Sequence, residues 1–324
     1  MSYFLIAVST RHNLDLCIKH ALAGFTDSIS GLWTYLDIEV SDYVSFLYGA
    51  RAYNLYQVAK KVAYKSPQTL PPWPPLILKP SGRTYQFPFR LELTPIRALE
   101  EPLVRAEFAY VAENLLLRGG YRKTHFQADQ TTLQHVSEMG FPSSSRPEPL
   151  NLGNAETFTP GLVRRRKEAQ PPITFALREL IIQTLLRRHL SAAGTLNQFL
   201  VGAGIPGLDA TKLEVLGEKA FPEGHVDILI KEATPMGMGR KVVVEVKLGR
   251  VSNADIEQLR LYMERLGEEC AGGVLVASTF GKRILKRAAE QGIACSQYAL
   301  EGVGETSLDC DSLLSRFQVT PVSA

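Results

Sequence analysis

The chain has 324 residues, of which 45% are hydrophobic and 21% are charged, with a formal net charge of +3. This composition is that of an ordinary soluble globular protein, the length favours two domains over one core, and the charge permits an acidic partner without requiring one. Four cysteines without CxxC spacing argue against a zinc site or a disulfide framework, so we expect a cytoplasmic protein. No segment reaches the roughly 20 apolar residues that span a bilayer, so we expect no membrane partner.

The first 140 residues carry mainly strand patterns. "YFLIAVS" opens the chain as a strand, and the helical spacing of Leu14, Ile18 and Leu22 predicts a helix after it. Three further apolar runs separated by turn residues predict strands at 43–49, 52–65 and 85–96. A helix that ends at Gly119 and Gly120 follows. We therefore expect a first domain over residues 1–140.

The segment after this domain has a different composition. Residues 141–172 are rich in Pro, Ser and Asn, show weak periodicity and include a basic cluster, Arg164–Lys167. Such a composition is typical of an exposed linker. We expect a linker here, a second domain over 173–302, and a tail over 303–324 about which the sequence is uninformative.

The second domain begins with helical spacing and then alternates. "ITFALRELIIQTLLRRHL" predicts a helix with Glu179 in its first half, and "HVDILI" and "KVVVEVK" predict strands. A helix over 253–267, a strand over 272–278, a helix over 281–292 and a strand over 293–298 follow. The strand–helix–strand crossover implies parallel pairing. The whole chain is thus expected to have an α/β (α+β) fold.

Charged residues interrupt one of these apolar strands. In "KVVVEVKLGR", Glu245 and Lys247 are two residues apart and share one face of a strand. If the neighbouring strand is antiparallel, Asp227 lies on the same face. Buried charges are costly unless they are paired or bound to a metal, and two converging carboxylates favour a cation such as Mg²⁺ or Mn²⁺. The sequence predicts a metal site at Asp227 and Glu245, with Lys247 stabilising charge on a phosphoryl oxygen.

These residues resemble a nuclease family. "GHVDILI" followed about eighteen residues later by "EVK" is similar to the D…ExK signature of PD-(D/E)xK nucleases, and "QLRLY" is similar to the QxxxY element of the RecB-like and NucS-like branches. The resemblance covers about residues 173–300. It implies that Gln258 positions water or phosphate, that Tyr262 supports the site, and that Glu179 is an additional catalytic residue linked to the metal. The alternative for the strand charges is an exposed edge with a salt bridge; His225, Glu214 and Glu218 are expected at the surface.

The first domain resembles the EVE/YTH group of PUA-like β-barrels, on the segments "YFLIAVSTRHN", "IKH" and "DYVSFLYG" and on an intervening Trp. Those modules hold a modified or flipped base between aromatic faces, with polar groups at its edge. The resemblance implies a base-binding role for Trp33, Tyr48, Trp73, Ser9 and Asn13. Trp33 is expected in an exposed Gly-rich loop, and the prolines of "PPWPP" are expected to hold Trp73 in place. The alternative is that these aromatic residues belong to the core of a small barrel.

A loop rich in cations and glycines, "RGGYRKTHFQ", has the composition of a segment that contacts a nucleic-acid backbone. The candidate contacts are Arg118, Arg122 and Lys123. A solvated helix end is the alternative.

Taken together with the charged site, the two resemblances imply a Mg²⁺-dependent, modification-dependent DNA endonuclease of the restriction or defence type, in which the first domain reads a modified base. Cutting both strands needs two such centres, so a homodimer is expected. One alternative is a NucS-like nuclease acting on mismatched or branched DNA. Another is a non-catalytic reader of modified nucleic acid.

Overall fold

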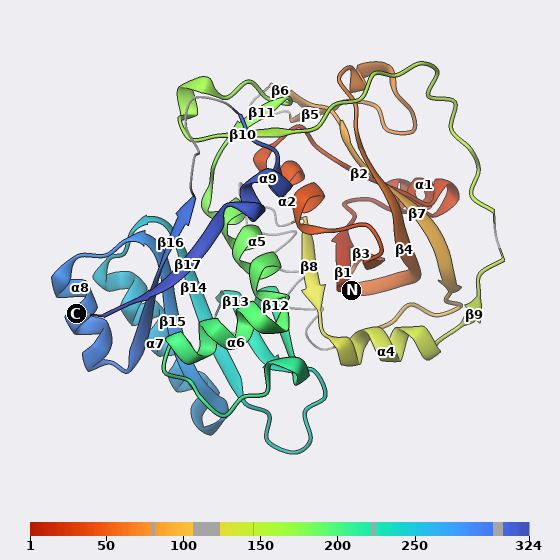
Figure 1. The fold of residues 1–324 in the computed structure, drawn as a ribbon. Helices are drawn as coiled ribbons and strands as arrows, with labels where there is room; N and C mark the ends of the chain where they lie inside the picture. The colour runs from red at the N-terminus through yellow and green to blue at the C-terminus, as the bar shows by residue number, and fades with distance from the viewer. Residues whose placement is uncertain (79–81, 106–123, 145, 222–223, 301–306, 324) are drawn as a thin grey trace. The chain divides into compact units, whose positions relative to one another are not determined.

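The computed structural model describes residues 1–78, 82–105, 124–144, 146–221, 224–300 and 307–323 (Figure 1). Two compact units divide the chain, Met1–Ala176 and Leu177–Ala324. Each unit has its own main β-sheet with helices beside it, so the expected mixed α/β fold class is confirmed. None of the described helices is both long and apolar enough to cross a membrane.

The first unit is built on a seven-stranded sheet in the order β2-β7-β4-β3-β1-β8, with β9 paired to β7. β1 and β3 are parallel and the other pairs are antiparallel. The strands are β1 (Tyr3–Ala7), β2 (Leu22–Phe25), β3 (Tyr43–Tyr48), β4 (Arg51–Ala63), β7 (Phe89–Ala98), β8 (His125–Ala128) and β9 (Phe141–Pro142). Within the described strands, no pairing closes β2 onto β8.

Three helices of the first unit start at a side-chain cap. Thr10, Ser28 and Asp129 accept hydrogen bonds from the first turns of α1 (Arg11–His20), α2 (Ile29–Asp37) and α4 (Gln130–Glu138). The helix predicted to reach Leu22 ends earlier, because Ala21 adopts a left-handed conformation (φ 42°) and Leu22 pairs with β7 instead. The structure also places a helix, α2, over the Gly-rich segment predicted as a loop.

The segment 141–172, predicted as a linker, groups with the first unit. The N–H of Phe158 donates to the carbonyl of Ala63 (2.9 Å), and Tyr64 forms a β-bridge with Thr157. β10 (Gly161–Val163) pairs in parallel with β11 (Thr174–Ala176), and Leu162 is fully buried. A few apolar residues in a polar segment are enough to hold it against the core, while the basic cluster at 164–167 is exposed as predicted.

Smaller elements complete the first unit. β5 (Leu76–Leu78) and β6 (Arg83–Tyr85) form a two-stranded hairpin, and short 3-10 turns occur at Pro67–Thr69 and Arg166–Glu168.

The second unit contains a six-stranded sheet in the order β12-β13-β14-β15-β16-β17. β13 and β14, which contain "HVDILI" and "KVVVEVK", are antiparallel, so the condition for a shared face is met. The predicted parallel crossover is confirmed in β15–β16, and β14 and β15 are parallel as well. β12 and β17 are antiparallel edge strands that the sequence patterns did not indicate. The strands are β12 (Leu213–Phe221), β13 (Gly224–Glu232), β14 (Lys241–Arg250), β15 (Cys270–Thr279), β16 (Ile293–Leu300) and β17 (Phe317–Val322).

Helices cover both faces of this sheet (Figure 1). On one face α7 (Asn253–Leu266) and α8 (Lys282–Glu290) pack on an apolar cluster that includes Leu229, Val243 and Leu275. On the other face lie α5 (Glu179–Leu190) and α6 (Ala193–Gly202), and α9 (Cys310–Ser315) contacts α5. Short 3-10 turns occur at Ala210–Lys212 and Gly267–Glu269. The face that holds α7 is also the face of Glu245.

Candidate active site

The site is centred where β13 and β14 separate. Their backbone pairing runs from Lys231↔Lys241 to Ile228↔Val244. At the next position the Asp227 carboxylate accepts a hydrogen bond from the N–H of Val246 (2.8 Å). Continuing the register by one residue sets Asp227 beside Glu245, so both carboxylates lie on one face of the sheet, as predicted.

Glu245 is the most deeply buried member of the site, with 1% of its surface exposed. Its Oε1 accepts from Lys247 Nζ (2.8 Å) and from Gln258 Nε2 (3.1 Å). Its Oε2 is buried and has no hydrogen-bond partner within the described part of the chain. A carboxylate oxygen in that position is destabilising unless a further ligand binds it.

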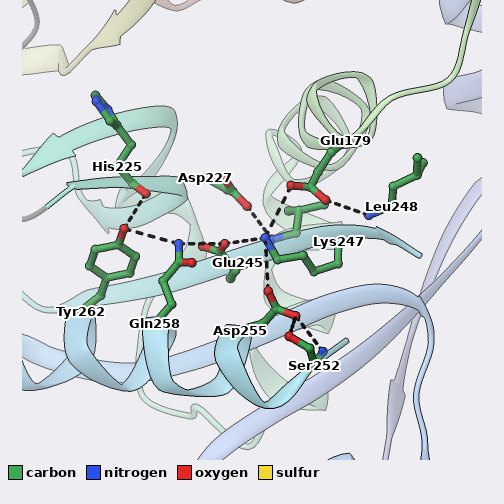
Figure 2. A network of polar contacts seen from close by, with 11 residues as sticks. Glu179, His225, Asp227, Glu245, Lys247, Leu248, Ser252, Asp255, Gln258 and Tyr262 are labelled. Atoms are coloured by element: carbon green, nitrogen blue, oxygen red, sulfur yellow. Dashed lines mark hydrogen bonds and ion pairs between the residues drawn. The ribbon is translucent and has the colours of Figure 1, made fainter. Parts of the chain in front are cut away.

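Lys247 connects the carboxylates of three elements (Figure 2). Besides Glu245 at 2.8 Å, its ammonium lies 3.5 Å from Glu179 Oε1, at the first residue of α5, and 3.7 Å from Asp255 Oδ1, in the first turn of α7. Glu179 also accepts from the N–H of Leu248 through its Oε2 (3.2 Å). The structure therefore brings Glu179, which the resemblance linked to the metal, to the ammonium, on the far side of it from α7.

Burial and neighbouring charge determine the electrostatics. Burial, together with the charge of Asp227, raises the pKa of Glu245 to about 8, although Lys247 acts in the opposite direction. Burial alone would lower the pKa of Lys247, but the charges of Glu245, Asp227 and Glu179 outweigh it and hold that pKa above its ordinary value. The site therefore places a cation beside a carboxyl group whose ionisation is disfavoured by burial.

Gln258 and Tyr262 reach the site from one face of α7, as their spacing of four predicts. Gln258 Nε2 donates to Glu245 and lies 3.5 Å from the Tyr262 hydroxyl, which donates to the carbonyl of His225 (2.9 Å). Burial raises the pKa of Tyr262. Gln258 thus orients the Glu245 carboxylate, and Tyr262 ties α7 to the start of β13.

Asp255 belongs to the network and was missed from the sequence. Its Oδ2 accepts from both the N–H and the hydroxyl of Ser252 (2.7 Å each), which makes a capping box at the start of α7. The signal was present in "SNAD", a Ser followed three residues later by an acid. That pattern predicts a helix cap, and only the fold shows that the same carboxylate faces Lys247.

His225 and Glu214 were expected at the surface, and the structure places both differently. His225 is half-buried rather than solvent-facing. Glu214, expected as a surface charge, is 15% exposed and pairs with Lys231 at 2.8 Å. The side chain of Glu218 lies outside the described residues.

The aromatic residues predicted to bind a base in the first unit are largely buried. Trp33 is 2% exposed inside α2 and packs against His125, with ring centroids 4.3 Å apart, so the prediction that it lies in an exposed loop is wrong. Ser28 caps the start of α2, and Leu32 and Leu36 on this helix are buried in the core, so Trp33 lies in a buried helix. Trp73 is 6% exposed, because it packs against Gly24, Phe87 and Arg90.

The remaining predicted base-binding residues are accessible. Ser9 is exposed, Asn13 and Tyr48 are half-buried, and Asn13 Nδ2 lies 3.5 Å from Ser9 Oγ. β1 and β3 are parallel with Ala7 opposite Leu47, so Ser9 and Tyr48 follow the same edge of the sheet. The predicted backbone contacts Arg118, Arg122 and Lys123 lie outside the described residues.

Comparison with known proteins gives limited similarity. No protein-family model matches the chain, and no curated protein does. Among solved structures, the EndoMS–dsDNA2 complex is 24% identical over 33% of this chain and 43% of that one, with a TM-score of 0.22. A repair endonuclease from Pyrococcus abyssi is 21% identical over 32% of this chain and 44% of that one, with a TM-score of 0.23. This chain thus spans less than half the length of either, and its function is argued from the site itself.

Proposed function

We propose that the chain is a divalent-metal-dependent DNA endonuclease whose second unit hydrolyses a phosphodiester bond. One observation carries the proposal: Glu245, fully buried next to Asp227, has a carboxylate oxygen without a partner in the described structure and an ammonium 2.8 Å from its other oxygen. A purely structural ion pair would satisfy both oxygens. An unsatisfied oxygen supports a further ligand.

The residues present fit a hard cation. Among the described residues no group of three or more His, Cys, Asp or Glu side chains is arranged around a common point as a metal cage. Mg²⁺ does not need one, since it is commonly held by one or two carboxylates and completes its shell with water and substrate phosphate. Asp227 and Glu245 would hold it, and the preference of Mg²⁺ for oxygen ligands matches this pair.

Each polar residue then has a defined role. A bound Mg²⁺ supplies Lewis-acid polarisation of a phosphoryl oxygen and a more acidic water. Lys247 stabilises negative charge that develops on the phosphoryl group, and Glu179 and Asp255 hold its ammonium in place. Gln258 fixes the orientation of the Glu245 carboxylate, and Tyr262 fixes the helix that carries Gln258.

The direct test is cleavage of DNA by the purified chain. Wild type and Glu245→Gln are incubated with double-stranded and single-stranded DNA in Mg²⁺ or in EDTA. We expect cleavage by wild type in Mg²⁺ alone and none by the variant, which keeps the size of the side chain and loses its charge. Equal cleavage by both proteins, or cleavage in EDTA, would contradict the proposal.

Recognition of a modified base by the first unit is part of the proposal that rests on the sequence resemblance. Ser9, Asn13 and Tyr48 are the accessible candidates for it, since Trp33 and Trp73 are buried. Matched methylated, unmethylated, mismatched and branched DNAs in the same assay separate a modification-dependent enzyme from one directed at DNA structure. A homodimer is proposed because two centres are needed to cut both strands, and analytical ultracentrifugation tests it.

A further inference from the structure

A group of exposed cations lies next to the candidate active site. Arg250, Lys282, Arg283 and Lys286 are all exposed. None of the four makes an ion pair within the described part of the chain. We call these four residues the α8 cationic surface.

The fold places this surface at the edge of the sheet that carries the site. β14 and β15 are parallel, so their carboxyl ends meet at one edge, and Arg250 lies opposite Thr279 there. Arg250 follows Lys247 by three residues on β14. Its guanidinium lies against Gly281, where an added Cβ would come within 2.5 Å of Nη2. Arg250 therefore joins the end of the catalytic strand to the start of α8.

The stability of α8 does not account for these charges. Acidic residues stabilise the first turn of a helix, yet the first turn of α8 has none and carries Lys282 and Arg283 instead. Arg287, on the same helix, is used differently: it forms an ion pair with Glu257 of α7 at 2.7 Å and ties the two helices together. Like charges four residues apart on a helix, such as Lys282 and Lys286, are mildly destabilising, and a bound anion would offset this.

Spacing and exposure favour an extended polyanion over a small ion. Lys282 and Lys286 are one helical turn apart, about 6 Å along the axis. That separation is comparable with one to two nucleotide steps of a duplex strand, each about 3.4 Å. Exposed cations spread along a helix suit backbone phosphates, which are contacted without regard to base sequence.

We infer that the α8 cationic surface binds the DNA phosphate backbone to one side of the bond that is cut. This inference rests on the proposed function. The surface begins at Arg250, three residues after Lys247 on β14, so the polyanion that it binds is the DNA strand cut at the site. The surface fixes where the duplex lies relative to the site, and it supplies affinity that decreases with salt.

The test is the salt dependence of DNA binding in EDTA, where no hydrolysis is required. Fluorescence anisotropy of a labelled duplex is measured from 50 to about 300 mM KCl for wild type, for Arg250→Gln and for K282Q/K286Q. The matched control is K212Q/R240Q, which removes two exposed cations from the opposite edge of the sheet, where β14 begins. All five substituted residues are exposed, and thermal melts verify that the variants fold.

The slope of log K against log salt is negative, and loss of two phosphate contacts is expected to reduce its magnitude by about 1.8 in K282Q/K286Q. Loss of one contact in Arg250→Gln is expected to reduce it by about 0.9. The control keeps the wild-type slope. A wild-type slope in both α8-surface variants, or an equal reduction in the control, would overturn the inference, as would a wild type that binds no DNA. A wild type that binds with this salt slope but cleaves nothing contradicts only the proposed catalysis.

Discussion

Glu245 lies in the middle of a run of valines, and its surroundings explain why a carboxylate is tolerated there. Lys247 and Gln258 both donate to its Oε1, while its Oε2 is buried and has no donor among the described residues. The spacing of Glu245 and Lys247 in the sequence predicted their shared face. It did not predict which oxygen would be satisfied, because that depends on a glutamine thirteen residues away on a helix.

Replacement of Lys247 by Met tests the role of the ammonium. Met preserves much of the side-chain volume, so we expect the fold and metal binding to persist while the cleavage rate falls about 10²–10³-fold through lost charge stabilisation. Single-turnover cleavage and Mn²⁺ titration of the same preparation measure the two properties. Cleavage at the wild-type rate would show that the ammonium serves structure alone.

The raised pKa of Glu245 predicts that metal binding releases a proton. With a pKa of about 8, the carboxyl is largely protonated at pH 7, whereas a metal ligand must be ionised. Raising the pH removes this competition, so the affinity for Mn²⁺ should increase up to about pH 8 and level off above it. Calorimetric titration at pH 7 in two buffers with different ionisation heats counts the released protons. A binding heat independent of the buffer contradicts this prediction.

At the scale of elements, the start of α7 combines two functions that substitution separates. Ser252→Ala removes one half of the capping box and is expected to lower the free energy of unfolding by about 1 kcal/mol, with cleavage preserved. Asp255→Ala should lower stability by a similar amount and also reduce cleavage, because its carboxylate lies 3.7 Å from Lys247 Nζ. Thermal melts and cleavage rates of both variants make the comparison. Equal activity of the two would assign Asp255 to capping only.

In the first unit, Gly24 of β2 allows Trp73 to pack against the sheet. A Cβ at this position would lie 2.3 Å from the indole ring. Gly24→Ala is therefore expected to destabilise the protein by about 1–3 kcal/mol through overpacking, with a change in tryptophan fluorescence. Gly194→Ala in α6 is the control, since nothing lies within 4 Å of its Cβ and a helical alanine is neutral or stabilising by up to about 1 kcal/mol. Unchanged fluorescence and stability in Gly24→Ala would show that the indole moves aside freely.

Elements with strong periodicity were predictable and those that depend on long-range pairing were not. The strands around Asp227 and Glu245 and the helix of Gln258 are found where the patterns placed them. β12 and β17 were missed because each is a polar edge strand whose pairing partner, not its own pattern, makes it a strand. α2 was missed because its capping residue, Ser28, lies among turn-forming residues.

For the whole molecule, composition and length predict two domains, and the structure divides into the compact units Met1–Ala176 and Leu177–Ala324. The segment 141–172 has the composition of a linker, yet Leu162 and Val163 are buried and pairing with Tyr64 and Ala63 holds it to the first unit. A few buried side chains outweigh an overall polar composition. The shared face of Asp227 and Glu245 was more predictable than the boundary, since alternation on two adjacent strands fixes it.

The central claim, that Asp227 and Glu245 jointly bind a divalent ion in the intact chain, is tested most directly by anomalous diffraction from crystals soaked in Mn²⁺. We predict a single Mn²⁺ peak within about 2.0–2.3 Å of an oxygen of each carboxylate, with Glu245 supplying Oε2, and no peak in Glu245→Gln crystals grown and soaked identically. No peak between the two carboxylates of wild type, or an equal peak in the variant, would contradict the account.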